Sequence, residues 1–297
     1  MWYRLGDIDY YLPPAPPGEW YRNVAAFDLH GTLIQSARGA HLIGKEQEWI
    51  WTYRHVPGVL EDLRRDFTLA VFSNVKGDRE VMKERMNLIF DALGYTFPAF
   101  LLYRKDWKPH PRSWELFLRF TGIVPGSDSF FCGDRYLPGK DADLAFSQNI
   151  GIRFFSPQEI FPVAVPEPRQ YQEVIILIGQ PGSGKTTLAT EFAQRHPGYQ
   201  VVSSDDWKSK NKLLQRVDVL LSRGHSVIID ATNPTLERRD EYREIAGKYD
   251  ISTRVWWITR PGRTWNALRE TPVPEVAFRV YQGKFDFPAD EEYEMFP

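Results

Sequence analysis

Short apolar runs recur along the first half of the chain, and each is followed by small or polar residues that can begin a turn or a helix. Runs of four or five apolar residues with such flanks are typical of strands buried in a parallel sheet. We therefore predict strands at residues 24–27, 68–72, 100–103 and 129–132. The polar residues after these strands would gather at one carboxyl edge of the sheet, where open α/β sheets bind ligands.

The second half repeats the same order of strand, loop and helix. Apolar runs predict strands at residues 174–178, 200–202, 227–229 and 253–258, and the clearest helical patterns cover residues 186–195 and 236–248. Alternation of strands and helices is typical of α/β proteins. We expect two α/β domains, each a mainly parallel sheet flanked by helices.

A proline-rich segment separates the two halves. Residues 156–173 hold four prolines and few periodic apolar positions, a pattern that indicates a linker. The length of 297 residues also favours two domains, at roughly 100–200 residues per domain. We predict domains at residues 1–165 and 166–297.

Composition narrows the classes of partner. A net charge of -2 argues against a strongly basic nucleic-acid clamp or a polybasic membrane anchor, so any site for a polyanion must be local. No apolar run approaches the ~20 residues of a membrane span, and the first residues lack the order of a secretory signal. The single cysteine, Cys132, excludes an internal disulfide and a cysteine-built zinc site. We expect an intracellular protein, nuclear or cytoplasmic, with no membrane partner.

The second half contains a phosphate-binding pattern. Residues 179–186 read GQPGSGKT, fit G-x-x-x-x-G-K-[ST], and lie between a predicted strand and a predicted helix. Glycines let successive N–H groups point at a phosphate, and the helix N-terminus adds positive charge. Lys185 would neutralise the β- and γ-phosphates, and Thr186 would reach a bridging Mg²⁺. We expect ATP to contact Gly179, Gly182, Ser183, Gly184, Lys185, Thr186 and Thr187.

Other polar residues follow the strands of this half. Asp205 and Asp206 come after residues 200–202, and either a catalytic base or a helix N-cap explains them equally well. Asp230 is expected to support metal and water near the phosphates, with a plain strand-end carboxylate as the alternative. The stretch from residue 260 to 269 carries three arginines, any of which could close over the transferred phosphate.

These segments resemble the 5′-kinase domain of the polynucleotide kinase 3′-phosphatase family. The matching residues are 179–187, 204–206 and 229–234, then Val273 and Pro274 leading to Tyr281, Lys284 and Phe285. The resemblance implies that Asp205 activates the 5′-hydroxyl of a nucleic-acid end and that Arg269 is a lid arginine on the ATP phosphates. It also implies that Lys208 lies near a phosphate of the acceptor. Trp207 is our candidate for stacking in the acceptor groove.

The first half resembles the phosphatase domain of the same family. Residues 27–34 read FDLHGTLI and resemble the D-x-D-G-T-L signature of haloacid-dehalogenase-type phosphatases; further parallels lie at residues 103–109, 114–117, 142–143 and 155–159. The resemblance implies that Asp28 is a nucleophile and also binds Mg²⁺ together with Asp134. It further implies phosphate contacts and support from Thr32, Ser73, Asn74 and Asp143. Asp141 lies close enough to Asp143 to be an alternative.

Two lysines compete for the role of compensating the charge of the bound phosphate. Lys108 precedes a proline, as in the family, and is favoured over Lys105. The amino-terminal phosphopeptide-binding domain of animal members has no expected counterpart, since the first strand of this phosphatase-like domain begins at residue 24.

His30 departs from the family pattern. The family has an aspartate here, which protonates the leaving oxygen, later activates water, and offers its main-chain carbonyl to Mg²⁺. Histidine can also move a proton near neutral pH, and any residue offers the carbonyl. Three interpretations stay open: an active phosphatase with His30 as acid and base, a weakened site that still binds ends, and a deliberate inactivating substitution.

The sequence thus predicts an enzyme that heals nucleic-acid ends, adding phosphate to 5′-OH ends and removing it from 3′-phosphate ends. One alternative is a 5′-kinase with an inactive phosphatase domain; others are a non-catalytic end-binding protein and a small-metabolite kinase. Neither half shows a recognisable sensor of the 2′-hydroxyl, so both DNA and RNA ends are candidate substrates. A ligase is a candidate partner, and no pattern indicates an oligomeric state.

Overall fold

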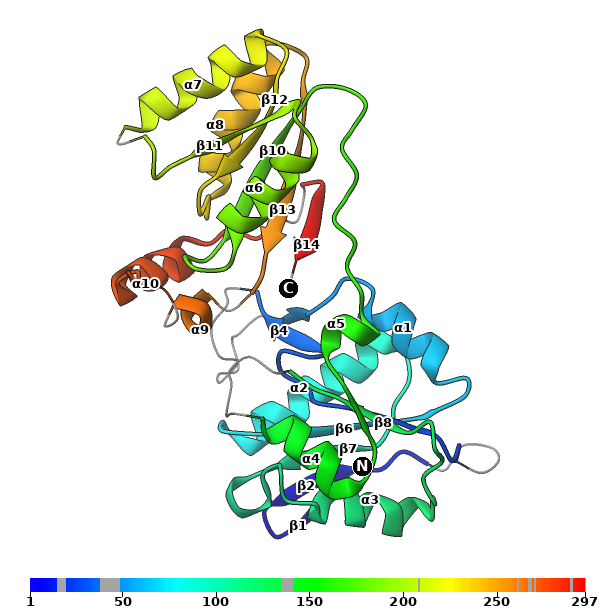
Figure 1. Cartoon of the computed structure of the whole chain (residues 1–297). Coiled ribbons are helices and arrows are strands. Elements are labelled where there is room, and N and C mark those ends of the chain that lie inside the picture. The colour runs from blue at the N-terminus through cyan, green and yellow to red at the C-terminus, as the bar shows by residue number, and fades with distance from the viewer. Residues whose placement is uncertain are drawn as a thin grey trace. The chain divides into compact units, whose positions relative to one another are not determined.

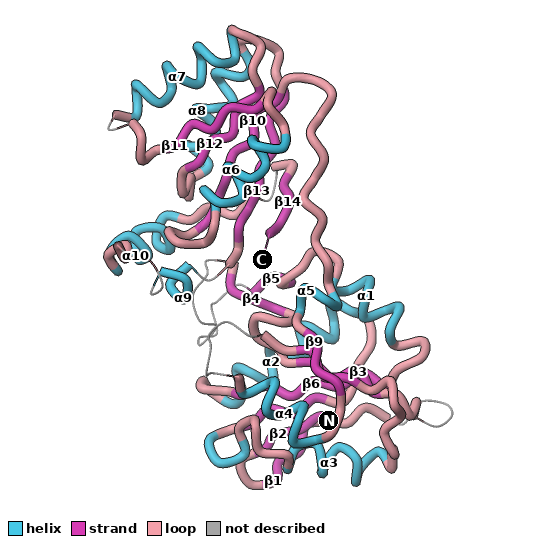
Figure 2. The backbone as a smooth tube through the Cα atoms, in the orientation of Figure 1, coloured by secondary structure: helices cyan, strands magenta, loops and turns pink. Residues whose placement is uncertain are grey.

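The computed structural model describes residues 1–14, 20–37, 49–134, 141–207, 209–260, 262–266, 269, 271–288 and 291–296. The chain divides into two compact units, and the main boundary between them falls between Val163 and Ala164. Figures 1 and 2 show that each unit has its own sheet with helices against it. We describe each unit by itself.

The first unit is built on a seven-stranded sheet with the order β1-β2-β7-β6-β3-β8-β9. The five strands from β7 to β9 run parallel, whereas β1 and β2 are antiparallel to their neighbours. The strands are β1 (Trp2–Leu5), β2 (Ile8–Tyr11), β3 (Val24–Phe27), β6 (Thr68–Asn74), β7 (Ala99–Leu102), β8 (Phe130–Cys132) and β9 (Arg153–Phe155). A separate antiparallel pair joins β4 (Ile34–Ser36) to β5 (Trp49–Trp51).

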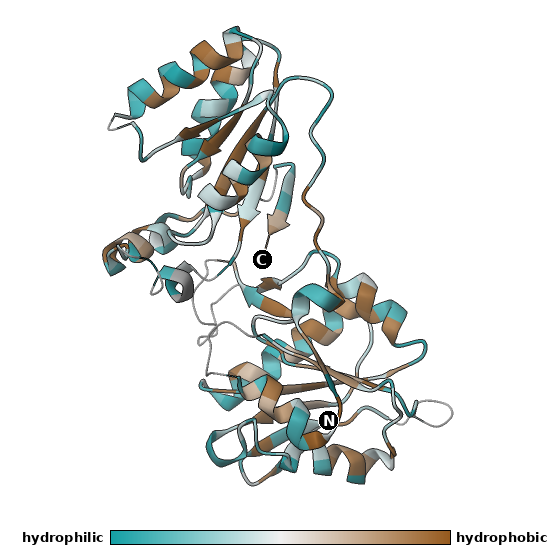
Figure 3. Ribbon diagram, viewed as in Figure 1, coloured by the Kyte–Doolittle hydropathy of each residue, from teal (hydrophilic) through white to brown (hydrophobic). Residues whose placement is uncertain are grey.

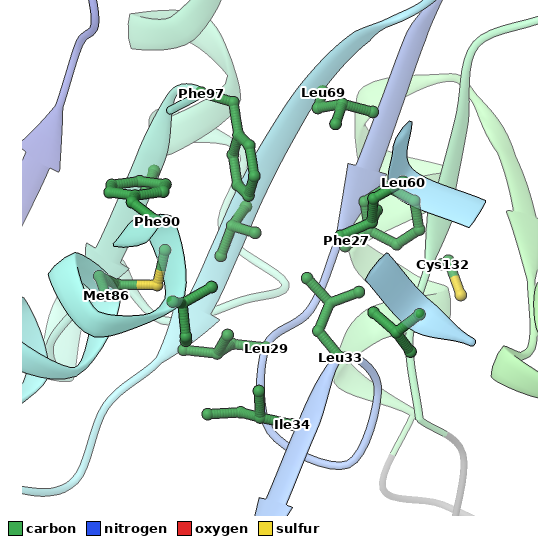
Figure 4. Packing of buried hydrophobic residues seen from close by; sticks show 14 of the residues in the cluster. Phe27, Leu29, Leu33, Ile34, Leu60, Leu69, Met86, Phe90, Phe97 and Cys132 are labelled. Carbon is green, nitrogen blue, oxygen red and sulfur yellow. The ribbon is translucent and has the colours of Figure 1, made fainter. Parts of the chain in front are cut away.

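Both faces of this sheet are apolar, because alternate residues of each strand point to opposite sides. In β3, Ala25 and Phe27 belong to one buried cluster, while Val24 and Ala26 belong to the other. Figure 4 shows the first cluster, which includes Phe27, Leu29, Leu33 and Leu60. A sheet with two buried faces needs helices on both sides.

The helices of the first unit provide this cover. Helices α1 (Val56–Leu63) and α2 (Arg79–Leu93) pack on the first cluster, and α3 (Arg112–Thr121) and α4 (Ala142–Ile150) pack on the second. Short turns of helix lie at η1 (Arg104–Asp106) and α5 (Pro157–Ile160).

The second unit contains an all-parallel, five-stranded sheet with the order β11-β12-β10-β13-β14. Figure 3 colours the central strands β10 and β12 mostly brown, that is hydrophobic, as expected for strands buried on both faces of a sheet. The strands are β10 (Glu173–Gly179), β11 (Tyr199–Ser203), β12 (Ser226–Asp230), β13 (Ser252–Ile258) and β14 (Tyr293–Phe296). The helices are α6 (Lys185–Arg195), α7 (Lys210–Ser222), α8 (Leu236–Gly247), α9 (Gly262–Asn266) and α10 (Glu275–Lys284).

The predicted fold class is confirmed, and the eight predicted strands coincide with observed strands to within two residues at either end. The expected linker at residues 156–173 is partly wrong. Its first residues form α5, and Phe161 is fully buried in the first unit, while Glu173 already belongs to β10. Strands β1, β2, β4, β5, β9 and β14 were not predicted.

Within the described residues, no helix is both long enough and apolar enough to cross a membrane.

Candidate functional sites

Three carboxylates meet at the carboxyl edge of the first sheet. Asp28 directly follows β3, Asp134 comes two residues after β8, and Asp143 lies in the first turn of α4. Each offers an oxygen, and these oxygens lie within 4.8 Å of one another. Parallel strands bring their ends to one edge, so residues more than 100 positions apart in the sequence form one cluster.

Lys108 is the cationic centre of this cluster. Its Nζ lies 2.6 Å from Asp28 Oδ1 and 2.6 Å from Asp143 Oδ1, and its side chain is almost fully buried. Burial lowers the pKa of Lys108, but the charges of Asp143 and Asp28 outweigh that effect, so its pKa is raised. The lysine therefore stays protonated and balances part of the negative charge.

The carboxylates themselves are held in an unfavourable environment for charge. Burial raises the pKa of Asp143 to about 6, although Lys108 acts in the opposite direction. Burial, followed by the charges of Asp28 and Asp143, also raises the pKa of Asp134 well above its usual value. A bound cation would relieve this repulsion.

The donor set suits a magnesium ion. Mg²⁺ prefers oxygen ligands and binds through one or two carboxylates together with water and substrate phosphate. Asp28 and Asp134 could supply such ligands, and the backbone carbonyl of His30 is a further oxygen two residues after Asp28.

Gly133 allows the cluster to close. A Cβ added at this position would lie 2.4 Å from Asp143 Oδ2, which is closer than non-bonded atoms approach. Only glycine lets the end of β8 pass this near to α4.

The predicted phosphate-contact residues lie at the end of β6 or in the loop after β3. The Ser73 hydroxyl lies 3.4 Å from His30 Nδ1, which brings the unusual histidine to the predicted phosphate contact. Asn74 instead clamps the main chain of Lys108: its Oδ1 accepts from Lys108 N at 2.7 Å, and its Nδ2 donates to Lys108 O at 3.3 Å. Thr32 is buried, and its hydroxyl has no hydrogen-bond partner among the described residues.

The structure distinguishes the members of the two pairs of alternatives in this half, a pair of lysines and a pair of aspartates. Lys105 is exposed in η1, whereas Lys108 reaches the carboxylates. Asp141 is the residue before α4 and does not belong to the cluster that Asp143 joins. The geometry thus favours Lys108 and Asp143.

The second unit carries the phosphate-binding loop at the end of β10. Gly182 and Gly184 have φ angles of 75° and 98°, so the turn needs glycine at both positions. Helix α6 begins at Lys185, whose Nζ donates to the carbonyls of Gly179 at 2.9 Å and Gln180 at 2.7 Å. An ammonium group thus lies inside the curl of the loop.

Asp230 joins this loop from the neighbouring strand. Its Oδ2 accepts a hydrogen bond from Thr186 Oγ1 at 2.8 Å, and its carbonyl accepts from Ser204 N at 2.9 Å. Strands β10, β12 and β11 are neighbours in the sheet, so the loop, Asp230 and the segment of Asp205 start from adjacent strand ends.

Charges from three segments act on Lys185. Burial lowers the pKa of Lys185 to about 8; the carboxylates of Asp230 and Asp205 act to raise it, and Arg269 acts to lower it. The predicted base and the predicted lid arginine thus both contribute to the electrostatic environment of the phosphate-binding lysine.

The remaining predicted kinase residues are accessible or lie outside the described residues. Asp205 and Arg269 are exposed, and Trp207 is half-buried. Arg263, another of the three arginines considered, is paired with Glu275 at 2.6 Å. Lys208 falls outside the described part of the chain.

Sequence reasoning missed several residues that shape this site. Gly262 passes so close to the loop that an added Cβ would lie 2.1 Å from the carbonyl oxygen of Pro181. Asn233 and Arg239 hold the segment after Asp230, with Asn233 Nδ2 donating to Leu177 O at 2.8 Å. The resemblance covered Asn233 within residues 229–234, but no local signal distinguished Arg239 from the other arginines of its helix.

Together, the two sites indicate the class of protein to which the chain belongs. One unit presents carboxylates around a buried lysine at a sheet edge, and the other presents a phosphate-binding loop beside an aspartate. The fold and these sites are those of an enzyme that handles phosphoryl groups at two separate places.

Comparison with known proteins identifies both halves. A family described as polynucleotide kinase 3 phosphatase matches residues 23–161, and one described as an AAA domain matches residues 174–288. The chain is 30% identical over 313 residues to a bifunctional polynucleotide phosphatase/kinase of Schizosaccharomyces pombe, covering 90% of this chain and 76% of that protein.

Two further relatives agree with this match. A putative bifunctional polynucleotide phosphatase/kinase of Acanthamoeba polyphaga mimivirus is 25% identical over 353 residues, covering 91% of this chain and 82% of the viral protein. The polynucleotide 3′-phosphatase ZDP of Arabidopsis thaliana is 27% identical over 170 residues, covering 46% of this chain and 24% of the plant protein. The chain belongs to the family of bifunctional polynucleotide phosphatase/kinases and is an enzyme with a phosphatase and a kinase domain.

Proposed function

We propose that residues 1–165 remove phosphate from 3′ ends of nucleic acid and that residues 166–297 add phosphate to 5′-OH ends. The observation that carries this proposal is the presence of two assembled sites in one chain, the carboxylates around Lys108 and the loop around Lys185. The products, a 3′-OH and a 5′-phosphate, are the ends that a ligase joins, so a ligase is the expected partner in the next step.

In the phosphatase site, Asp28 is the proposed nucleophile. An oxygen of its carboxylate attacks the terminal phosphorus, and the bond from phosphorus to the 3′ oxygen breaks as an aspartyl-phosphate forms. Lys108 lies against Asp28 and would stabilise the added negative charge. Mg²⁺ held by Asp28, Asp134 and the His30 carbonyl would supply positive charge that lets an anionic nucleophile approach phosphate.

His30 is the proposed acid and base of this site. It would give a proton to the departing 3′ oxygen and then take one from the water that hydrolyses the aspartyl-phosphate. The contact between His30 Nδ1 and Ser73 supports this role, because Ser73 comes from the predicted phosphate-binding strand end.

In the kinase site, Asp205 is the proposed base. It would take the proton of the 5′-hydroxyl as that oxygen attacks the γ-phosphorus of ATP and ADP departs. Lys185, Arg269 and the N–H groups of the loop would bind the phosphates. Thr186 and Asp230 would hold the Mg²⁺ that accompanies ATP.

The phosphatase proposal is tested with a 3′-phosphorylated oligonucleotide and Mg²⁺. Wild type should release inorganic phosphate, Asp28→Asn should release none, and His30→Ala should be slower by about 10²–10⁴-fold. The matched variant His30→Asp should stay active. If His30→Ala releases phosphate as fast as wild type, His30 is not the acid and base of this site. If wild type releases no phosphate and only His30→Asp does, the wild-type phosphatase domain is inactive.

The kinase proposal is tested by transfer of labelled phosphate from ATP to 5′-OH DNA and RNA oligonucleotides of the same sequence. Asp205→Asn should reduce transfer by about 10²–10⁴-fold, whereas the neighbouring Asp206→Asn should not. Equal loss in both variants would contradict the assignment of Asp205. The ratio of rates on the two oligonucleotides decides whether DNA or RNA ends are preferred.

A further inference from the structure

Arg239 is a fully buried arginine near the start of α8. Its Nε contacts both oxygens of Glu291 at 3.0 and 2.8 Å, and its Nη1 donates to the carbonyls of Asn233 and Pro234, both at 3.1 Å. Its Nη2 donates to the carbonyl of Asp286 at 3.0 Å. One guanidinium therefore joins three segments that are separate in the sequence.

The first of these segments leads directly from the kinase site. Asn233 and Pro234 follow Asp230, which accepts the hydrogen bond of Thr186. The same segment is bound to the phosphate-loop strand: Asn233 Nδ2 donates to Leu177 O at 2.8 Å, and Gly179 N donates to the carbonyl of Thr232 at 3.3 Å. Residues 230–234 are therefore held between β10 on one side and Arg239 on the other.

The other two segments come from the end of the chain. Asp286 lies two residues after α10; its N–H donates to Pro234 O at 2.8 Å, and its Oδ2 accepts from Leu236 N at 2.9 Å. Glu291 lies just before β14 and also pairs with Arg243. Arg239 thus links the chain just after α10 to the segment that follows Asp230.

Burying such a charged group is unfavourable, and well-packed apolar residues often stabilise a fold as well or better. The planar fork of arginine can, however, hold several acceptors in fixed positions, which a lysine cannot do. Two of the acceptors are the main-chain carbonyls of Asn233 and Pro234, on the segment that follows Asp230, and this points to a role in geometry.

We propose that Arg239 is a positioning residue of the kinase site. It fixes residues 230–234 and thereby keeps Asp230 hydrogen-bonded to Thr186, the two residues that would hold the Mg²⁺ of ATP. The inference rests on the proposed kinase function, and it adds a residue that contacts neither ATP nor the acceptor.

The test compares Arg239→Lys with Arg254→Lys. Arg254 offers a matched control because it is also buried, in β13, and pairs with Glu173 through Nε at 2.8 Å and Nη2 at 2.9 Å. Glu173 is the first residue of β10, at the opposite end of the strand from the phosphate loop. Both variants replace a buried guanidinium by an ammonium group, but only Arg239→Lys loses contacts with the segment after Asp230.

The first readout is the Mg²⁺ concentration that gives half of the maximal kinase rate. Arg239→Lys should raise it by about tenfold, because residues that orient metal ligands typically change metal affinity by about 10–100-fold. Arg254→Lys should change it by less than about twofold. The Mg²⁺ dependence of the phosphatase in the same chain should not move in either variant. Equal shifts in the two variants would overturn the proposal.

The second readout needs no activity. Hydrogen exchange of the peptide covering residues 230–236 should be faster in Arg239→Lys than in wild type and unchanged in Arg254→Lys, because the segment loses its anchor. If Arg239→Lys does not fold, Glu291→Gln is used in its place, because this variant keeps the guanidinium of Arg239 but weakens its ion pair with residue 291. Unchanged hydrogen exchange of the 230–236 peptide in whichever of the two variants folds overturns the proposal. A wild-type protein without kinase activity would refute the proposed function itself. An active wild type, with variants whose Mg²⁺ requirement and hydrogen exchange are unchanged, refutes only the positioning role.

Discussion

Lys108 shows how one buried side chain organises a site. It bridges Asp28 and Asp143, and its own main chain is held by Asn74 from the neighbouring strand. The sequence predicted Asp28 and favoured Lys108 because both lie in short local patterns. It did not predict the clamp by Asn74, because a contact between residues 34 positions apart depends on the register of β6 and on the path of the loop after β7.

Replacing Lys108 by methionine should reveal the repulsion that it offsets. The variant keeps much of the buried volume but leaves Asp28 and Asp143 without their cation, so the free energy of unfolding of the first unit should fall by about 3 kcal/mol. Mg²⁺ should restore part of that loss, since it can take over the positive charge. Denaturant unfolding with and without Mg²⁺ measures both effects, and equal stability of the variant and wild type would refute the account of this cluster.

The lowered pKa of Lys185 predicts a pH dependence for ATP capture. Because burial lowers its pKa to about 8, the free enzyme loses the ammonium charge as pH rises through 8. The kcat/KM for ATP, which reports the free enzyme, should fall about tenfold between pH 7 and pH 9. In Lys185→Arg, whose side chain stays charged, this decline should be absent even though the overall rate is lower. A flat profile in wild type would contradict the prediction.

At the scale of elements, apolar periodicity predicted the central strands of both sheets and the edge strand β11, but it missed β1, β2 and β9 of the first sheet and β14 of the second. Strand β2 contains Asp9, a charged residue that is fully buried and therefore conceals the apolar pattern. Its charge is balanced by Arg4 at 2.8 Å and by Arg79 at 3.1 Å, and Arg79 lies 70 positions away. Such compensation exists only in the folded chain, so the sequence alone did not indicate this strand.

Helix α2 offers a prediction at the same scale. Its N-cap residue, Asp78, accepts hydrogen bonds from Glu80 N and Val81 N at 2.9 and 3.1 Å. Asp78→Ala should lower the free energy of unfolding of the first unit by about 1 kcal/mol, whereas Asp78→Ser should cost much less because serine also caps. Thermal unfolding followed by circular dichroism measures the difference, and equal loss in both variants would show that the cap does not explain it.

At the scale of the whole molecule, the chain combines a mainly parallel sheet and an all-parallel sheet, each with its own carboxyl edge and its own site. The resemblance of the sequence to one family predicted this pairing, and the comparisons confirm it over about nine-tenths of the chain. The described residues of each site belong to a single unit, so we expect that damage to one site leaves the other working.

The most direct test uses one oligonucleotide that carries a 5′-OH and a 3′-phosphate, incubated with Mg²⁺ and labelled ATP. We predict that wild type labels the 5′ end and removes the 3′-phosphate, that Asp28→Asn only labels, and that Lys185→Ala only removes phosphate. The affected activity should fall by at least about 10²-fold in each variant. Wild type that leaves the 3′-phosphate in place, or a single substitution that abolishes both activities in a folded protein, would contradict the account of two independent sites.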